Sequence, residues 1–166
     1  MGTLHEAFAS LQERVLDAVK AVYGDRLVSV VVYGSVARGT MRFDSDVDLL
    51  VVARGLPKGQ PRRRIEFQDV ERLLEPEMRR LAGLGVTTEL SVVFKTPEEV
   101  EIGSPLFFDM VEDAKILFDR DGAFARRLDR LRRRMTELGS KRIWKGNAWY
   151  WDLKPDYKPG EVFEIL

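Results

Sequence analysis

Two aspartates and a glycine–serine pair are the residues of this sequence whose types and spacing could do chemistry. Asp46 and Asp48 lie two positions apart at the start of an apolar run, so in an extended strand both side chains point to the same side. Two carboxylates this close repel each other unless a cation lies between them. Hard oxygen ligands favour Mg²⁺ or Mn²⁺, which also bind water and phosphate oxygens. We therefore expect an open metal site beside a phosphate site.

Gly34 and Ser35 supply donors for the phosphate. A glycine at a strand-to-helix turn lets backbone N–H groups approach an anion, and the Ser35 hydroxyl adds another donor. Arg38 and Arg42 follow in the connecting segment, and guanidinium groups bind phosphate oxygens through paired hydrogen bonds. We expect Gly34, Ser35 and Arg38 to bind the phosphates, with Arg38 preferred over Arg42.

These residues need two strands to hold them in place. The β-branched and aromatic run Val28–Tyr33 predicts a mostly buried strand, and Asp46–Val52 predicts a second one. Between them, Val36–Arg38 is compatible with a short helix that ends at Gly39. The expected order is strand, glycine turn, helical turn and strand.

The same segment resembles the DNA polymerase beta-like nucleotidyltransferases, and among them the minimal nucleotidyltransferases. The resemblance rests on Gly34-Ser35, ten intervening residues and Asp46-Val47-Asp48, within the fuller patterns GSVARG and SDVDLLV. It covers about residues 28–118. The competing interpretation is a surface turn followed by an acidic strand end, which must account for Asp44, Asp46 and Asp48 together.

The resemblance implies both the fold and the ligands. The fold is expected to be α/β (α+β), a small mixed sheet of about four strands with packed helices, similar to the polymerase beta palm. Asp46 and Asp48 would hold one or two Mg²⁺ ions. Gly34, Ser35 and Arg38 would hold the β- and γ-phosphates of an NTP, with ATP as the expected substrate.

Relatives commonly carry a third carboxylate on the strand next to the aspartate pair, where it completes the metal ligands and deprotonates the attacking hydroxyl. The run Val86–Phe94 predicts that strand, and Glu89 is its only acid. Glu89 is therefore the expected third catalytic and metal-binding residue. Its longer side chain and its place near the start of the strand depart from the usual pattern, so a solvated acid at a strand end is the alternative.

Helical spacing, glycines and prolines predict the remaining elements. They are a helix over Thr3–Tyr23, a helix from Arg62 to Leu74 that kinks or restarts at Pro76 and finishes near Leu81 to Gly85, helices beginning at Thr96 and Ser104, a strand over Ala114–Phe118, and a helix from Phe124 to Leu138. The second helix and its flanking strands suggest a βαβ crossover.

Charged residues outside the predicted site are interpreted as solvated. His5, the single histidine, is expected to be exposed and not a ligand, and the Arg62–Arg64 triplet is expected to face water. The arginines of the last helix are expected to line its wet side, and no aromatic residue lies among them to stack bases. These arginines are Arg126, Arg127, Arg130, Arg132, Arg133 and Arg134.

Composition excludes several classes of protein. The chain has 166 residues, of which 45% are hydrophobic, enough for one core. Its 27 basic and 27 acidic residues balance, so a general nucleic-acid binder is not expected. The absence of cysteine excludes disulfides, thiolate metal sites and cysteine nucleophiles. No signal peptide or membrane-spanning run is recognised, so we expect a cytoplasmic protein without membrane association.

We expect two parts, a nucleotidyltransferase domain over residues 1–139 and an aromatic tail over residues 140–166. All three tryptophans lie in the tail. Such aromatic side chains bury against their own domain or against another chain, so a partner surface and a homo-oligomer both stay open.

The resemblance also implies a reaction and a partner. Minimal nucleotidyltransferases are often paired with a HEPN-type toxin and act as antitoxins that adenylylate one of its tyrosines. Two alternatives stay open. The protein could be a catalytically weak binding module that neutralises its partner by contact through the aromatic tail, or it could transfer a nucleotide to a small molecule. Small-molecule enzymes usually carry an extra helical domain, for which this chain has little room.

Overall fold

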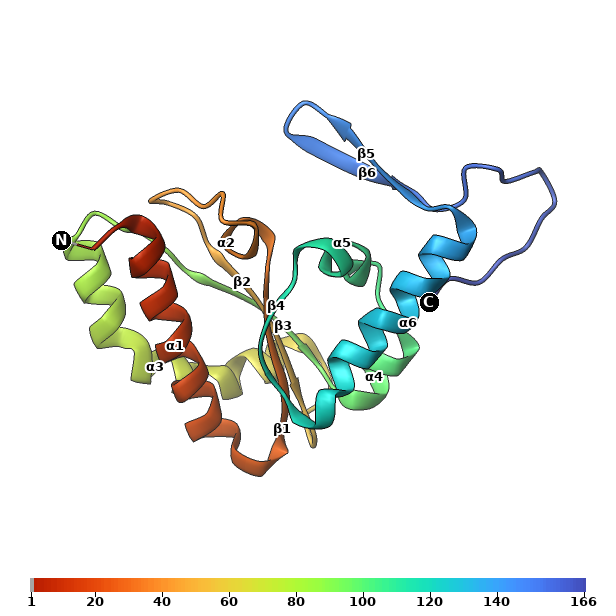
Figure 1. Cartoon of the computed structure of the whole chain (residues 1–166). Coiled ribbons are helices and arrows are strands. Elements are labelled where there is room, and N and C mark those ends of the chain that lie inside the picture. The colour runs from red at the N-terminus through yellow and green to blue at the C-terminus, as the bar shows by residue number, and fades with distance from the viewer. Residues whose placement is uncertain (1) are drawn as a thin grey trace.

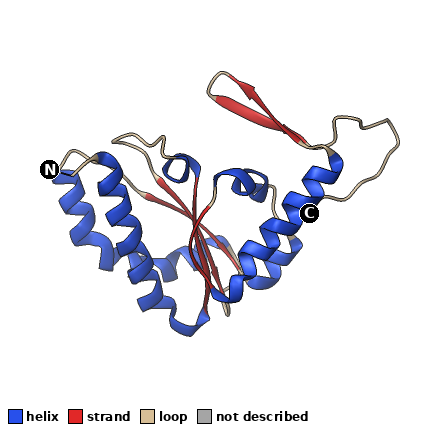
Figure 2. Cartoon of the chain, viewed as in Figure 1, coloured by secondary structure: helices blue, strands red, loops and turns tan. Residues whose placement is uncertain are grey.

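The computed structural model describes residues 2–166, and a four-stranded sheet lies at its centre (Figure 1, Figure 2). β1 pairs antiparallel with β2 and with β4, whereas β2 and β3 run parallel, so the predicted mixed sheet is confirmed. The third strand begins at Leu90 and not at Val86, which leaves Glu89 just before it. The sheet order is β3-β2-β1-β4, with β1 at Leu27–Tyr33, β2 at Val47–Ala53, β3 at Leu90–Lys95 and β4 at Lys115–Asp119.

Helices follow most of the predicted ranges. Thr3 and Thr96 each cap a helix with a capping box. The threonine side chain accepts a hydrogen bond from the backbone N–H of a glutamate three residues later, and the side chain of that glutamate accepts one from the threonine N–H. Among residues 2–166, no helix is both long and apolar enough to cross a membrane. The α-helices are α1 Leu4–Tyr23, α2 Gly34–Arg38, α3 Gln60–Gly83, α4 Pro97–Ile102, α5 Leu106–Asp113 and α6 Ala123–Leu138, and the 3₁₀ helices are Gly24–Arg26 and Arg120–Gly122.

Different helices cover the two faces of the sheet (Figure 1). On one face Leu49 and Val51 of β2 pack in a core with α1 and α3. On the other face Leu50 and Val52 pack in a second core with α4, α5 and α6. Because side chains alternate along a strand, Asp48 lies on the α5 and α6 side of the sheet.

The third helix, α3, runs through Pro76 as a single element, so the predicted restart is wrong. Proline removes one backbone hydrogen bond at a cost of about 3 kcal/mol. Val70 and Leu74 before it and Leu81 after it are buried in the same core, and burying three such side chains outweighs that cost. Figure 1 shows that the helix bends along its length. The β2-α3-β3 connection is the expected βαβ crossover.

Side chains of α3 occupy the outer edge of β3. Arg64 Nη1 donates to the Leu90 carbonyl over 3.3 Å. Gln60 exchanges two hydrogen bonds with the backbone of Phe94, at 3.0 Å to its carbonyl and 3.3 Å from its N–H. These contacts satisfy main-chain groups that an edge strand otherwise leaves open.

Arg63 is buried, so the expectation that the whole arginine triplet faces water is wrong. Its side chain is 6% exposed and forms a two-pronged pair with Glu99 of α4, at 2.7 and 2.8 Å. It also donates to the carbonyls of Pro57 and Phe94. Five N–H donors in a fixed fork let one guanidinium satisfy all these acceptors.

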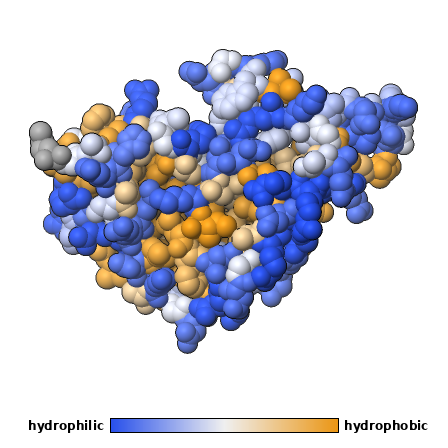
Figure 3. Space-filling view, viewed as in Figure 1, coloured by the Kyte–Doolittle hydropathy of each residue, from blue (hydrophilic) through white to orange (hydrophobic). Residues whose placement is uncertain are grey.

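The arginines of α6 mostly face solvent, as Figure 3 shows by the polar surface over this helix. Arg127 is the exception and the prediction is wrong there, because this residue is 5% exposed. Its Nε donates to the Val100 carbonyl at 3.1 Å and its guanidinium lies over the Phe107 ring. It joins α6 to α4 and α5.

Beyond α6 the chain forms an antiparallel hairpin that the sequence interpretation missed, β5 at Lys141–Lys145 and β6 at Ala148–Asp152. Its two-residue turn contains Gly146 with a φ of 62°. A Gly-Asn turn between two aromatic runs is a hairpin signal. Cross-strand pairing places Arg142, Trp144, Trp149 and Trp151 on one face.

Candidate active site

The Asp48 carboxylate lies directly against Gly34, where β1 leads into α2. A Cβ atom built on Gly34 would lie 2.2 Å from Asp48 Oδ2. The φ of Gly34 is +72°, a conformation that side-chain-bearing residues rarely adopt. Glycine is therefore required here for two independent reasons, and the predicted phosphate turn and metal carboxylate are in contact.

Asp46 immediately precedes β2 and lies beside Glu89. Its Oδ1 accepts a hydrogen bond from the Glu89 N–H at 3.3 Å, and the Val47 N–H donates to the Glu89 carbonyl at 2.9 Å. In the parallel register Asp48 lies opposite Ser91. Asp46, Asp48 and Glu89 therefore belong to the same face of the sheet.

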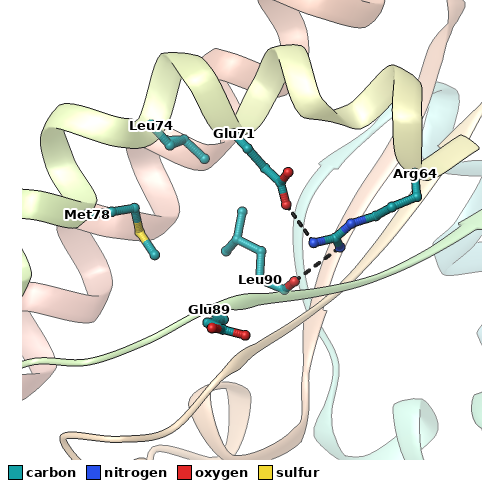
Figure 4. A pocket seen from close by; sticks show the side chains of 6 residues that line it. All are labelled: Arg64, Glu71, Leu74, Met78, Glu89 and Leu90. Carbon is teal, nitrogen blue, oxygen red and sulfur yellow. Dashed lines mark hydrogen bonds and ion pairs between the residues drawn. The ribbon is translucent and has the colours of Figure 1, made fainter.

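Figure 4 shows that the side chains of Glu89, just before β3, and of Leu90, its first residue, turn to opposite sides of the backbone. Leu90 points toward α3, where a cavity of about 320 Å³ is lined by Arg64, Glu71, Leu74, Met78, Glu89 and Leu90. Arg64 reaches across this cavity, pairing with Glu71 at 2.6 Å. Neither aspartate lines the cavity, so the predicted chemistry belongs to the other face of the sheet.

The electrostatics of the aspartate pair fit a cation. Burial raises the pKa of Asp48, and the charge of Asp46 raises it further, whereas Arg38 lowers it. A divalent ion supplies the positive charge that would stabilise both carboxylates in ionised form. Within residues 2–166, however, no three acidic, histidine or cysteine side chains already form a metal cluster. Asp46 and Asp48 are therefore the candidate metal donors. Glu89 contacts Asp46 through its backbone N–H, and its exposed side chain does not join the two aspartates in a three-acid group.

Tyr33 is a neighbour of the site that the sequence analysis did not single out. It lies opposite Asp48 across the β1–β2 pair. Burial, together with the charge of Asp48, raises the pKa of Tyr33 to about 12. The phenol therefore stays protonated at neutral pH and keeps its hydrogen-bond donor.

Arg38 ends α2 and connects the site to α5 and to the hairpin. Its Nη1 lies 3.6 Å from Asp113 Oδ2, and its guanidinium carbon lies 4.8 Å from the centre of the Trp149 ring. Arg142 binds the same Asp113 oxygen more closely, at 2.9 Å. Asp113 and Trp149 were not predicted as site residues, because only the folded chain brings three distant segments together.

The start of α2 leaves its first N–H groups without a side-chain cap. Ser35 is half-buried there, within the first turn. Arg42, by contrast, pairs with Asp44 at 3.6 Å and both side chains are strongly exposed. His5 is exposed and lies 3.2 Å from the Gly39 carbonyl, as a backbone-bound side chain. The geometry thus favours Arg38 over Arg42 as the phosphate ligand.

Comparison with known proteins gave one family match. Residues 12–116 match the family described as nucleotidyltransferase domain. A protein of Methanocaldococcus jannaschii with the provisional name protein adenylyltransferase MJ1305 is 34% identical over 125 residues, which are 74% of this chain and 80% of that protein.

Two solved structures are also similar to the chain. A toxin-antitoxin crystallised with AMP-PNP is 15% identical, with a TM-score of 0.43 over 77% of this chain and 92% of that one. The toxin-antitoxin MntA-HepT is 12% identical, with a TM-score of 0.41 over 79% of this chain and 92% of that one.

Proposed function

The chain belongs to the nucleotidyltransferase domain family and is an enzyme of that type, and from this premise we propose that it transfers AMP from ATP to a hydroxyl group of a partner protein. The observation that carries the proposal is the contact between Asp48 and Gly34. This contact joins a carboxylate suited to a divalent ion to the turn suited to a triphosphate. The provisional name of the Methanocaldococcus jannaschii relative supports a protein acceptor.

Gly34, Ser35 and Arg38 are proposed to hold the β- and γ-phosphates. Backbone N–H groups of the turn and the Ser35 hydroxyl donate to the phosphate oxygens. Arg38 is available for phosphate binding because its own ion pair with Asp113 is long, at 3.6 Å. Arg142 forms the shorter ion pair with the same carboxylate, at 2.9 Å. A phosphate oxygen can therefore replace Asp113 as the partner of Arg38 without leaving Asp113 unpaired.

Asp46 and Asp48 are proposed to hold one or two Mg²⁺ or Mn²⁺ ions. When bound, such an ion neutralises the triphosphate and stabilises the charge that develops on the α-phosphoryl group during transfer. The aspartates fit this ligand because both offer hard oxygen donors on one face and because their mutual repulsion is relieved by a cation.

The reaction exchanges one P–O bond for another. The acceptor hydroxyl oxygen bonds to the α-phosphorus. At the same time the bond between that phosphorus and the oxygen bridging the α- and β-phosphates breaks, and pyrophosphate leaves with the electron pair. The hydroxyl proton needs a base on the same face. We assign that base to Glu89, whose side chain is exposed and whose N–H donates to Asp46.

A tyrosine of a HEPN-type toxin is the proposed acceptor, which makes this protein an antitoxin. The support is the resemblance of the GSVARG and SDVDLLV segments to minimal nucleotidyltransferases. The contact-only alternative relies on the aromatic tail, yet Trp149 and Trp151 of that tail donate to Asp109 of the same chain. These two rings are engaged within the protein, so a contact-only partner would have to use the exposed Trp144, Tyr150 and Tyr157.

One experiment separates catalysis from neutralisation by contact. The protein is incubated with α-labelled ATP, Mg²⁺ and the product of the neighbouring gene, and the Asp46→Asn/Asp48→Asn variant is run in parallel. We expect labelled partner with the wild type and none with the variant, and mass spectrometry to place AMP on a tyrosine. Unlabelled partner that is neutralised equally by both proteins would support the binding module instead.

A further inference from the structure

The tryptophan face of the C-terminal hairpin is docked on α5. Trp149 Nε1 and Trp151 Nε1 both donate to Asp109 Oδ1, at 2.7 and 2.8 Å. Arg142, on the same face, donates to Asp113 Oδ2 at 2.9 Å. Because α5 also contacts α2, the hairpin is fixed beside the helix that carries Ser35 and Arg38.

Trp144 belongs to the same face of the hairpin as Trp149 and Trp151, but α5 does not cover it. It lies opposite Trp149, next to the turn of the hairpin, and remains 54% exposed. Figure 1 shows the turn end of the hairpin projecting past α5 in the direction of α2. The ring is nevertheless held, since its centre lies 5.0 Å from that of Trp149 and 5.5 Å from the Arg142 guanidinium. A large aromatic face is thus fixed in position and open to a ligand.

Arg38 connects this aromatic pair to the phosphate site. Its guanidinium stacks 4.8 Å from the Trp149 ring centre, while Arg38 is also the proposed ligand of the triphosphate. In a nucleoside triphosphate the α-phosphate and the ribose separate the β- and γ-phosphates from the base. A nucleotide whose phosphates lie at Arg38 can therefore place its base near the tryptophans.

We propose that Trp144, backed by Trp149 and Arg142, forms a stacking wall for the base of the bound NTP. Stacking suits this surface because every nucleobase is planar, and the neighbouring guanidinium groups add cation–π attraction. The inference rests on the proposed function, in which the Gly34 turn binds the phosphates. It extends that function by giving the hairpin the role of binding the base. The ligand class is a nucleoside triphosphate, and a purine offers the larger stacking face.

The test separates base recognition from phosphate recognition. Binding of ATP and of inorganic tripolyphosphate, both with Mg²⁺, is measured by calorimetry for the full chain and for Trp144→Leu, Trp144→Phe and Tyr150→Leu. Tyr150 is the matched control, because it lies on the opposite face of the same hairpin and is 49% exposed. Circular dichroism and thermal unfolding confirm that each variant is folded.

We expect Trp144→Leu to weaken ATP binding about 5- to 150-fold, the range that follows from the loss of one stacked base. Its affinity for tripolyphosphate stays unchanged, Trp144→Phe retains most of the ATP affinity, and Tyr150→Leu changes neither. Equal ATP affinity of wild type and Trp144→Leu overturns the stacking wall alone. A wild type that binds neither ATP nor tripolyphosphate overturns the proposed function together with it.

Discussion

Gly34 and Asp48 lie so close that one hydrogen on the glycine Cα cannot be replaced by a methyl group without a 2.2 Å contact to the carboxylate. This relationship couples the turn after β1 to the acid on β2. It also makes the geometry of the proposed phosphate turn depend on the position of Asp48, the proposed metal ligand.

Replacing Gly34 by alanine should therefore be far more disruptive than the same change at Gly139. Both glycines have a left-handed φ, +72° and +71°, but nothing lies within 4 Å of a Cβ at Gly139. Gly139→Ala measures the backbone strain alone, about 1–2 kcal/mol. Gly34→Ala adds the contact with Asp48. Urea unfolding should show the larger loss for Gly34→Ala, together with loss of AMP transfer, and equal losses would contradict the structure.

Neutralising Asp48 should separate stability from activity. Burial and the neighbouring Asp46 raise the Asp48 pKa, so the ionised side chain opposes folding. Without Mg²⁺, Asp48→Asn should unfold at a higher temperature than the wild type at neutral pH. As the pH falls through the raised pKa, Asp48 gains its proton in the wild type and this advantage should disappear, fully so below the ordinary value of 3.8. Nucleotidyl transfer should fall at least about 10²-fold. If wild type and Asp48→Asn differ in stability by the same amount at every pH, the Asp48 pKa is not raised and the prediction is wrong.

Glu89→Gln tests the assigned base. Loss of a general base typically reduces the rate about 10²- to 10⁴-fold, with little change in nucleotide affinity. Glu98→Gln is the control, since Glu98 is also an exposed acid but lies in the first turn of α4, beyond the end of β3 that is opposite to Glu89. If Glu89→Gln and Glu98→Gln transfer AMP at the wild-type rate, Glu89 is a solvated acid and another group takes the proton.

Asp109→Ala should release the hairpin from α5. The change leaves the indole N–H groups of Trp149 and Trp151 without their shared acceptor, at about 1–3 kcal/mol for each. Trypsin should then cleave more rapidly after the exposed Lys141 and Lys145. Asp109→Asn keeps a carbonyl acceptor and should be cleaved at an intermediate rate. Identical cleavage of all three proteins would show that Asp109 does not hold the hairpin.

Glu99→Gln should destabilise the fold by about 1–3 kcal/mol, because the buried Arg63 loses its charged partner. The hydrogen bonds from Arg63 lower the pKa of Glu99, so the ionised carboxylate stabilises the native state. This stabilisation is present above the ordinary pKa of 4.5 and is lost as the pH falls through the lowered pKa. Urea unfolding of the wild type and the variant at several pH values should show the difference shrinking in acid.

Local periodicity predicted the individual strands and the shared side of the two aspartates, whereas the mixed four-stranded sheet was expected from the family resemblance. Alternation along β2 places Asp48 apart from the buried Leu49 and Val51, and Glu89, just before β3, likewise points away from Leu90, the first residue of that strand. Such patterns are properties of a few consecutive residues. They require no knowledge of which helix covers which face.

Contacts between distant segments were not predictable in this way. Arg38 meets Asp113 and Trp149 only after α2, α5 and the hairpin assemble. Arg63 and Arg127 were predicted from the sequence to face water. Both are buried, because backbone carbonyls lie within hydrogen-bonding distance of their guanidinium groups. Local spacing says nothing of where such acceptors will be.

The capped edge of β3 also decides how another polypeptide can approach this protein. Gln60, Arg63 and Arg64 already bind the outward main-chain groups of Leu90 and Phe94. A foreign strand cannot extend the sheet along this border without first displacing them. A protein substrate that approaches along β3 therefore meets side chains of α3 at these two positions and not free main-chain groups.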